Sequence, residues 1–323
     1  MKRVLVTEPI HAAGMDLLLA RNDVEVIEAP DVSPETLRRL MPGIHGIAVR
    51  TAKLPAELLS QANDLQVVSR HGVGCDNVAV DHLTSRGIPV AIAAGANSTS
   101  VAEHTMGLVL ACARRMFAQD AAVRAGEFGM RSKLIATDLE GARMLIVGFG
   151  RVGRKVARLA RAFGMDVVVA DIALDTGLAA DMGCRGVEDF RPELPSADVV
   201  TVHVPLDETT RHLVSAPEMA AMKPGAILIN CARGGVVDEK ALVAALDAGQ
   251  LLAAGLDVFD EEPPPPSSPL LARDDVVLAP HTGAASFGAM REMARMAAQN
   301  VLDTFDDRLD PDCVFNHAEL ARQ

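Results

Sequence analysis

The sequence contains no tryptophan and no tyrosine, and aromatic residues make up only 3% of it. It therefore lacks the stacking side chains that proteins use to bind single-stranded nucleic acids. Basic residues are also few, with 31 Lys and Arg against 43 Asp and Glu and a formal net charge of −12. Because this charge repels phosphate backbones and anionic lipids, we expect neither a nucleic-acid partner nor a membrane partner.

Cysteine pairs and long apolar runs are also missing. The five scattered cysteines form no Cys-x-x-Cys pair: Cys75, Cys112, Cys184, Cys231 and Cys313. This pattern predicts neither a disulfide framework nor a bound metal, and it favours the reducing cytoplasm. The apolar run at residues 4–6 ends at Thr7, too early for a signal-peptide core, and no run approaches the length of a bilayer span.

What the sequence does contain is enough apolar material for about two ordinary domains. The 323 residues are 49% hydrophobic and 23% charged, which is typical of globular proteins. In the first 92 residues, short β-branched runs alternate with helical patterns. The expected strands are 4–7, 24–27, 46–49, 65–69 and 88–91, and the expected helices are 11–20, 34–40 and 55–61. Strict alternation predicts a parallel sheet with right-handed crossovers.

A second series of apolar runs begins after residue 143. Its expected strands are 144–147, 167–170, 199–202, 226–229, 253–256 and 276–278. The sequence thus predicts an α/β protein with two doubly wound parallel sheets.

Two helices are expected to connect the two series. Ser100 and Glu103 have capping-box spacing before an apolar helix that runs to about Arg114. The apolar surface of this helix indicates burial, either inside one chain or against a second subunit. A final helix over 284–305 is long enough to return to the first series. We therefore expect a discontinuous domain at 1–97 and 286–323 and a second domain at 98–285.

A glycine-rich turn lies between a strand and the helix expected at 154–163. Gly148, Gly150 and Gly153 have the Gly-x-Gly-x-x-Gly spacing of a dinucleotide-binding loop. Asp171 follows the next strand, where a carboxylate can bind ribose hydroxyls and repel a 2′-phosphate. The pattern predicts a nucleotide site and favours NAD over NADP.

Polar residues follow three further strands at 230–235, 256–263 and 279–283. Carboxyl ends of parallel strands meet at one edge, where ligands bind. An arginine there can bind a carboxylate, and a histidine titrates near neutrality. These groups suit reduction of a ketone beside a carboxylate.

Four segments resemble the signatures of the D-isomer-specific 2-hydroxyacid dehydrogenases, including the phosphoglycerate dehydrogenases. They are the glycine loop, Cys231–Glu239, Leu256–Phe259 and Pro280-His281, and the loop Arg70–Asn77 resembles that family's substrate-domain loop. The resemblance covers nearly the whole chain. It implies a flavodoxin-like substrate domain, a Rossmann NAD domain and a cleft between them. It also implies a dimeric enzyme that transfers hydride between NAD(H) and a small 2-hydroxy or 2-keto acid.

The resemblance also implies roles for individual residues. His281 would exchange a proton with the substrate oxygen, Glu262 would orient His281, and Arg233 would bind the substrate carboxylate. Substrate contacts would also come from Arg50 and from the backbone N–H groups of Val73 and Gly74. The expected cofactor contacts are Gly148, Gly150, Arg151, Val152, Gly153, Asp171, Val204, Cys231 and Asp257.

Other interpretations of these residues stay open. Arg233 can instead pair with Asp238, and Glu261 competes with Glu262. His71, His104 and His203 are interpreted as structural or peripheral, although His71, beside the substrate loop, could contact the substrate anion. Cys231 has no neighbouring base and is not expected to be a nucleophile.

The substrate is open as well. Arg50 resembles a position that favours a substrate with two anionic ends, such as 3-phosphoglycerate. Hydroxypyruvate, glyoxylate and a sulfonated hydroxy acid are alternatives. Because the sequence ends at Gln323, we do not expect the serine-sensing regulatory domain that some phosphoglycerate dehydrogenases append. An NAD-sensing corepressor of the same fold, or a Rossmann module without redox chemistry, is the non-enzymatic alternative.

Overall fold

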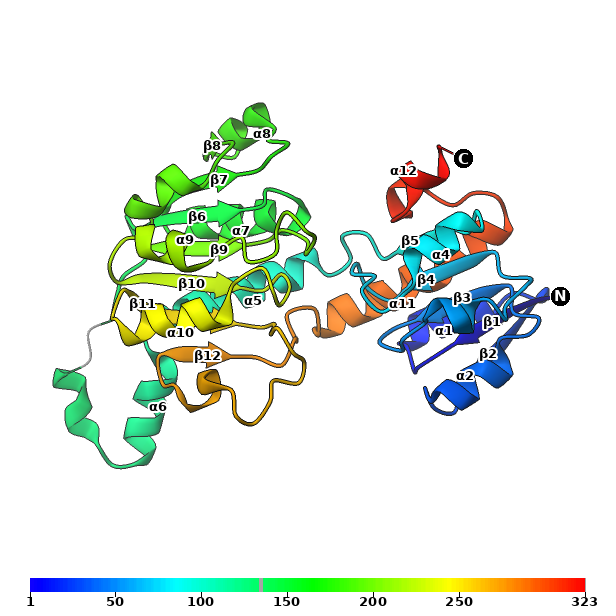
Figure 1. Ribbon diagram of the computed structural model, residues 1–323, viewed down its shortest axis with the longest axis horizontal. Coiled ribbons are helices and arrows are strands. Elements are labelled where there is room, and N and C mark those ends of the chain that lie inside the picture. Colours follow the sequence, from blue (N-terminus) through cyan, green and yellow to red (C-terminus); the bar gives the residue numbers. More distant parts are fainter. Residues whose placement is uncertain (134–135, 323) are drawn as a thin grey trace. The chain divides into compact units, whose positions relative to one another are not determined.

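The computed structural model describes residues 1–133 and 136–322 and divides into two compact units (Figure 1). Unit 1 consists of Met1–Asn97 and Ala285–Gln323, and unit 2 of Ser98–Ala284. Within the described ranges, none of the helices combines the length and apolar character of a membrane span.

Unit 1 is built on a parallel five-stranded sheet with the order β2-β1-β3-β4-β5. This is the flavodoxin-like order that the sequence analysis expected. The strands are β1 (Lys2–Val6), β2 (Val24–Glu28), β3 (Gly46–Val49), β4 (Val67–Arg70) and β5 (Val90–Ile92). The helices are α1 (Ala12–Leu19), α2 (Pro34–Leu40), α3 (Ala56–Leu59), α4 (Val80–Ser85), α11 (Phe287–Phe305) and α12 (His317–Leu320).

Both faces of this sheet are buried, because alternate residues of a strand point to opposite faces. Val4 and Val6 join a cluster that contains Val301 of α11, while Leu5 and Ile47 join a second cluster. Helix α11 packs against β3, β4 and β5, so the end of the chain completes the unit formed by its beginning.

Unit 2 is built on a parallel seven-stranded sheet with the order β12-β11-β10-β9-β6-β7-β8. Successive strands are added on one side of β6 up to β8 and then on its other side from β9 onward, as in a Rossmann fold. This strand order confirms the expected fold class. Its strands are β6 (Arg143–Val147), β7 (Asp166–Ala170), β8 (Arg185–Val187), β9 (Val199–Val202), β10 (Ala226–Asn230), β11 (Leu251–Leu256) and β12 (Val276–Leu278). Its helices are α5 (Ser98–Ala113), α6 (Met116–Arg124), α7 (Arg151–Ala162), α8 (Thr176–Asp181), α9 (Ala216–Ala221) and α10 (Glu239–Asp247).

Two expected helix starts are wrong. Helix α5 begins at Ser98, so Ser100 lies inside the first turn and is not the residue that caps the helix. Helix α7 begins at Arg151, with Gly150 at its N-cap, so the third glycine of the loop belongs to the helix. In both cases the polar or glycine residues that we expected to precede a helix form its first turn.

The apolar surface of α5 is largely explained inside unit 2. Most of the helix is buried, including Met106, Leu108 and Val109, and it packs against α7, β10 and β11. Large exposed apolar side chains instead lie on the following segment, which extends away from the sheet in Figure 1. They are Met116, Phe117, Val123 and Phe128.

Candidate active site

The expected site residues of unit 2 follow the carboxyl ends of six strands. The glycine loop follows β6, Asp171 follows β7, and Val204 follows β9. Arg233, Asp257 and His281 follow β10, β11 and β12. Because all seven strands are parallel, these residues lie along one edge of the sheet.

The glycine loop is shaped by close backbone contacts. Gly148 has a φ of +101°, and a Cβ there would lie 2.7 Å from the carbonyl oxygen of His203. A Cβ on Gly153 would overlap the carbonyl oxygen of Gly148. A Cβ on Gly150 would meet no atom within 4 Å, so this glycine leaves open space at the start of α7. The three glycines therefore provide the turn, the open approach and the close packing that a pyrophosphate loop requires.

Unpaired backbone donors show that the loop suits a dinucleotide. Within the described part of the chain, the N–H groups of Gly150, Arg151 and Val152 have no acceptor. Such groups at a helix start attract the phosphates of a nucleotide. The residues present thus fit the pyrophosphate of NAD.

Asp171 is fixed beside this loop. Its Oδ2 accepts a hydrogen bond from the backbone N–H of Phe149 at 2.7 Å, and its Oδ1 accepts one from Ala173 at 2.9 Å. The carboxylate keeps lone pairs for ribose hydroxyls. Arg185, the next basic residue along the chain, forms an ion pair with Glu193. The end of β7 therefore presents the Asp171 carboxylate, which suits ribose hydroxyls, and Arg185 is paired with Glu193, so this basic side chain does not favour a 2′-phosphate.

His203 and Val204 line the other side of the glycine turn. The Val204 side chain lies 3.1 Å from the position that a Gly148 Cβ would occupy. His203 Nε2 lies 3.0 Å from Thr201 Oγ1, and burial lowers the pKa of His203 to about 4. His203 is therefore neutral near pH 7 and adds no charge beside the phosphates.

His281 and Glu262 form a close pair. Nδ1 of His281 lies 2.8 Å from Oε2 of Glu262, and both side chains are about half exposed. The other carboxylate oxygen of Glu262 accepts a hydrogen bond from the backbone N–H of Phe259 at 3.1 Å. The backbone of Phe259 thus fixes the Glu262 carboxylate. Nε2 is the ring nitrogen of His281 that faces away from Glu262.

The Arg233 loop packs directly against the segment that carries Glu262. A Cβ on Gly234 would overlap the carbonyl oxygen of Phe259, and Gly235 N–H donates to Asp260 Oδ1 at 2.7 Å. The guanidinium of Arg233 donates to the Ala232 carbonyl at 2.7 Å. Asp238, the alternative partner considered from the sequence, accepts from the first N–H groups of α10. The loops after β10 and β11 therefore lie in contact.

Asp257 and Cys231 are both buried. Asp257 is 2% exposed and accepts hydrogen bonds from the backbone N–H groups of Thr282 and Gly283, each at 2.8 Å. Burial raises the pKa of the Cys231 thiol to about 12, so it stays protonated and is a poor nucleophile. Asp257 thus holds the backbone that directly follows His281.

His104 is a site-adjacent residue that the sequence analysis interpreted as structural or peripheral. Its Nε2 lies 3.3 Å from Oδ1 of Asp257. The sequence offers no signal for this contact, because residue 104 lies in an apolar helical pattern far from residue 257. Only the folded chain brings the two side chains together.

The expected substrate residues Arg50, Val73 and Gly74 all lie in unit 1. Arg50 follows β3, and its backbone N–H donates to Glu8 Oε2 at 3.0 Å. Burial alone would raise the pKa of Glu8, but hydrogen bonds from Thr51, Thr7 and this backbone lower it. Glu8 was missed in the sequence analysis, although its place directly after a strand could have indicated it. It holds the Arg50 loop through the backbone.

The loop after β4 carries Val73 and Gly74. No residue in 1–133 or 136–322 accepts a hydrogen bond from the backbone N–H of either. His71 begins this loop and is 3% exposed. Burial lowers the pKa of His71, and the charges of Arg50 and Arg70 add to the effect. Two unpaired N–H groups, in a loop whose His71 is affected by the charges of Arg50 and Arg70, form an environment that suits an anion.

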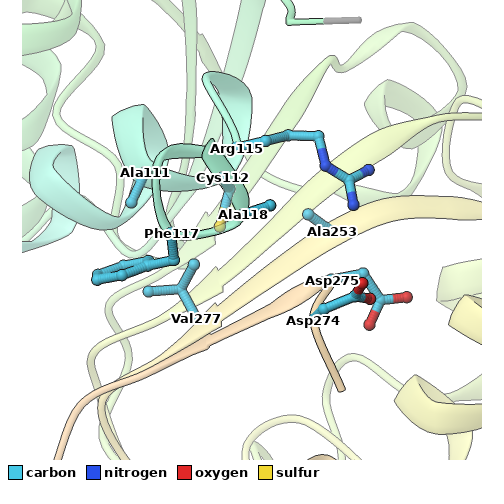
Figure 2. Close-up of a pocket in the computed structure, with 9 residues that line it drawn as sticks. All are labelled: Ala111, Cys112, Arg115, Phe117, Ala118, Ala253, Asp274, Asp275 and Val277. Carbon is cyan, nitrogen blue, oxygen red and sulfur yellow. The ribbon is translucent and has the colours of Figure 1, made fainter. Parts of the chain in front are cut away.

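A small pocket lies elsewhere in unit 2, between α5, α6 and the sheet (Figure 2). Cys112 of α5 and Arg115, the N-cap residue of α6, line it together with Val277 and Asp275. Burial raises the pKa of Cys112 to about 12, so this thiol is also inert. The pocket contains none of the expected site residues, and within the described chain no group of His, Cys, Asp and Glu could hold a metal ion.

Comparison with known proteins identifies a family model that matches most of unit 2. Residues 106–283 match the D-isomer specific 2-hydroxyacid dehydrogenase NAD binding domain. A solved glyoxylate reductase from Paecilomyes thermophila superposes with a TM-score of 0.88 at 28% identity and covers 98% of this chain and 99% of that one. The fold and the chain length therefore agree with a solved relative.

Two curated relatives differ in how much of their own length is matched. The D-3-phosphoglycerate dehydrogenase of Methanocaldococcus jannaschii is 39% identical over 302 residues, which are 93% of this chain and 57% of that protein. The glyoxylate reductase of Aeropyrum pernix is 36% identical over 331 residues, covering 99% of this chain and 98% of that protein. The chain thus spans little more than half of the first relative and nearly all of the second.

Proposed function

Because the chain belongs to the D-isomer-specific 2-hydroxyacid dehydrogenase family, with its NAD-binding domain at residues 106–283, we propose that it is an NAD-dependent oxidoreductase that interconverts a small 2-hydroxy acid and its 2-keto acid. The observation that carries this proposal is the 2.8 Å pair between His281 and Glu262 at the strand edge that also holds Arg233 and the glycine loop. Unit 2 is the NAD domain, and unit 1 is the substrate domain.

His281 is the proton carrier in this proposal. Glu262 holds Nδ1 of the ring, so the proton exchanged with substrate resides on Nε2. In reduction, Nε2 donates its proton to the keto oxygen, and in oxidation it takes the proton from the hydroxyl. When NAD is bound, its nicotinamide would supply or accept the hydride at the substrate carbon that carries this oxygen. Glu262 fixes the orientation of the ring.

Arg233 and the unit 1 residues bind the substrate in this proposal. The guanidinium of Arg233 binds the carboxylate and polarises the ketone. The unpaired N–H groups of Val73 and Gly74 suit a carboxylate as well, and Arg50 suits a second anionic group. A substrate with two anionic ends, such as 3-phosphoglycerate, follows from Arg50, while hydroxypyruvate, glyoxylate and a sulfonated hydroxy acid are the alternatives.

An assay of NADH oxidation with a panel of acids tests this function. The panel contains glyoxylate, hydroxypyruvate and the keto forms of 3-phosphoglycerate and sulfolactate, with the reverse reaction followed for each hydroxy acid. We expect turnover of at least one pair, with kcat/KM for NADH about tenfold or more above that for NADPH, because Asp171 repels a 2′-phosphate.

Two outcomes of this assay would contradict the proposal. Preference for NADPH would overturn the role of Asp171. Tight NADH binding without turnover of any acid would favour an NAD-sensing corepressor of the same fold, and a protein that binds no dinucleotide would be a Rossmann module without redox function.

We also propose that the protein is a homodimer. The support is the apolar surface of the segment after α5, where Phe117 is 64% exposed and Phe128 is 65% exposed. Surfaces of this kind on a soluble protein mark association sites. We expect the wild type to sediment as a dimer and the double variant Phe117→Asp/Phe128→Asp to sediment as a monomer.

The control for the dimer is Leu19→Asp, which places the same charge on an exposed apolar residue of α1 in unit 1. This variant should remain a dimer. A wild type that sediments as a monomer, or a dimer that survives the double substitution, would show that this segment is not the interface.

We further propose a cytoplasmic location, supported by five free and buried thiols that a reducing compartment keeps reduced.

A further inference from the structure

His104 lies on α5, and its ring nitrogen Nε2 is buried 3.3 Å from Oδ1 of Asp257. Among the residues that the structure describes, no acceptor meets hydrogen-bond geometry with this nitrogen, so the 3.3 Å approach to Asp257 is a contact between a ring nitrogen and a carboxylate oxygen. Because a carboxylate only accepts hydrogen bonds, this contact is favourable when Nε2 carries the ring hydrogen. The contact therefore places a buried donor against the carboxylate.

Asp257 connects this histidine to the backbone beside His281. Its two oxygens accept the N–H groups of Thr282 and Gly283, which directly follow His281 in the chain. His281 itself has a left-handed φ of +54°, a conformation that non-glycine residues adopt only when their surroundings hold them there. The Asp257 carboxylate is the buried group that holds the peptide units after this residue.

The three groups are in direct packing contact. A Cβ on Gly283 would lie 2.9 Å from Oδ2 of Asp257 and 3.5 Å from Cδ2 of His104. Gly283 and α5 also stand next to the two places where the chain passes between the units, Asn97 to Ser98 and Ala284 to Ala285. The contact thus joins the first helix of unit 2 to its last loop.

We propose that His104 is a positioning residue that, through Asp257, fixes the Thr282–Gly283 backbone and thereby the orientation of His281. The effect on turnover rests on the function proposed above, whereas the effect on the structure of the His281 loop does not. His104 acts on the loop through Asp257 and does not need to contact substrate or cofactor.

The charge on Asp257 depends on these donors. Burial alone would raise the pKa of Asp257, but the His104 contact and the two backbone hydrogen bonds lower it below the ordinary value. The titratable groups that face Asp257 are His104 from α5 and the Cys231 thiol after β10. Removing His104 leaves a buried carboxylate with fewer donors, so Asp257 protonates at higher pH and then holds the loop less firmly.

Replacing His104 by leucine tests the inference. We expect kcat to fall about 10-fold to 100-fold, with KM for the keto acid changed less than about threefold, because the loss affects proton transfer more than binding. The acid side of the kcat profile should move to higher pH. His104→Gln, which keeps an N–H donor, should recover most of the loss. In an Asp257→Asn background, His104→Leu should have little further effect, because the two residues act as one unit.

A second readout does not depend on activity. In cofactor-free protein, the ring-proton NMR signal of His281, identified by its loss in His281→Gln, should move in His104→Leu toward the shift of an unrestrained histidine. Cys112→Ala, on the same helix two turns further on, controls for general damage to the packing of α5. This variant should lower the melting temperature without moving the His281 signal or the pH profile.

The results separate the two proposals. If His104→Leu lowers only the melting temperature, as Cys112→Ala does, or if its effect adds fully to that of Asp257→Asn, the positioning role is wrong. If the His281 signal moves as expected but the wild type reduces no keto acid, the positioning role stands and the proposed function fails.

Discussion

Replacing His281 by glutamine is expected to lower kcat for keto-acid reduction about 10²-fold to 10⁴-fold, the range that a positioned acid–base group contributes. Glutamine fills similar space but cannot carry the exchanged proton. NADH affinity should be nearly unchanged, because the proposed phosphate and ribose contacts lie at the glycine loop and at Asp171, which is fixed to that loop. Stopped-flow turnover and the fluorescence of bound NADH measure the two quantities.

The pH profile makes this expectation sharper. In the wild type, reduction should slow as pH rises, since Nε2 of His281 must start protonated, and oxidation should quicken. Both dependences should disappear in His281→Gln. A variant that keeps wild-type turnover, or that keeps the same pH dependence at a reduced rate, would show that the exchanged proton comes from another group.

Glu262 and Glu261 supply a matched pair of controls, because they are adjacent and both exposed. Only Glu262 contacts His281. Glu262→Gln should therefore reduce kcat about tenfold or more, through loss of a charge-assisted hydrogen bond, and Glu261→Gln should behave as the wild type. The reverse result would show that Glu261, and not Glu262, orients His281.

Much of the fold was predictable because both sheets are parallel and buried on both faces. Strands such as Val199–Val202 are then continuous apolar runs, which are easy to find in a sequence. The sequence analysis missed the edge strand β8, because this strand does not have such an apolar run. Arg185–Val187 is short, contains a glycine and has no fully buried residue, so it lacks the apolar run that identifies the others. Segment α6 was missed because its apolar side chains are exposed and follow no buried stripe.

The candidate site was predictable only in part. The glycine spacing and the strand-end positions are local features, so the sequence placed Gly148, Asp171 and His281 at one sheet edge. Contacts between distant segments have no local signal. The choice between Glu261 and Glu262, and the contact of His104 with Asp257, depend on how loops pack after the sheet has formed.

Replacing Gly234 by alanine is the second substitution with a large expected effect, although it changes a single methyl group. A Cβ at this position would overlap the carbonyl oxygen of Phe259, and its second nearest neighbour is also backbone of the same residue. Backbone cannot swing aside as a flexible side chain can, so the loops after β10 and β11 must separate. These loops carry Arg233 and Glu262, which places the disturbance within the proposed site.

We expect Gly234→Ala to lower the free energy of unfolding by about 1–3 kcal/mol, as overpacking does elsewhere. It should also lower kcat/KM about 100-fold or more, because a displacement of about 1 Å in the Arg233 loop is enough for such a loss. Gly107→Ala is the matched control. Gly107 lies within α5 with nothing within 4 Å of its added Cβ, so alanine there should stabilise the helix by about 0.5–1 kcal/mol. Urea unfolding and steady-state kinetics of both variants decide the matter. If the two alanines behave alike, the contact between the Arg233 loop and Phe259 does not determine the geometry of the site.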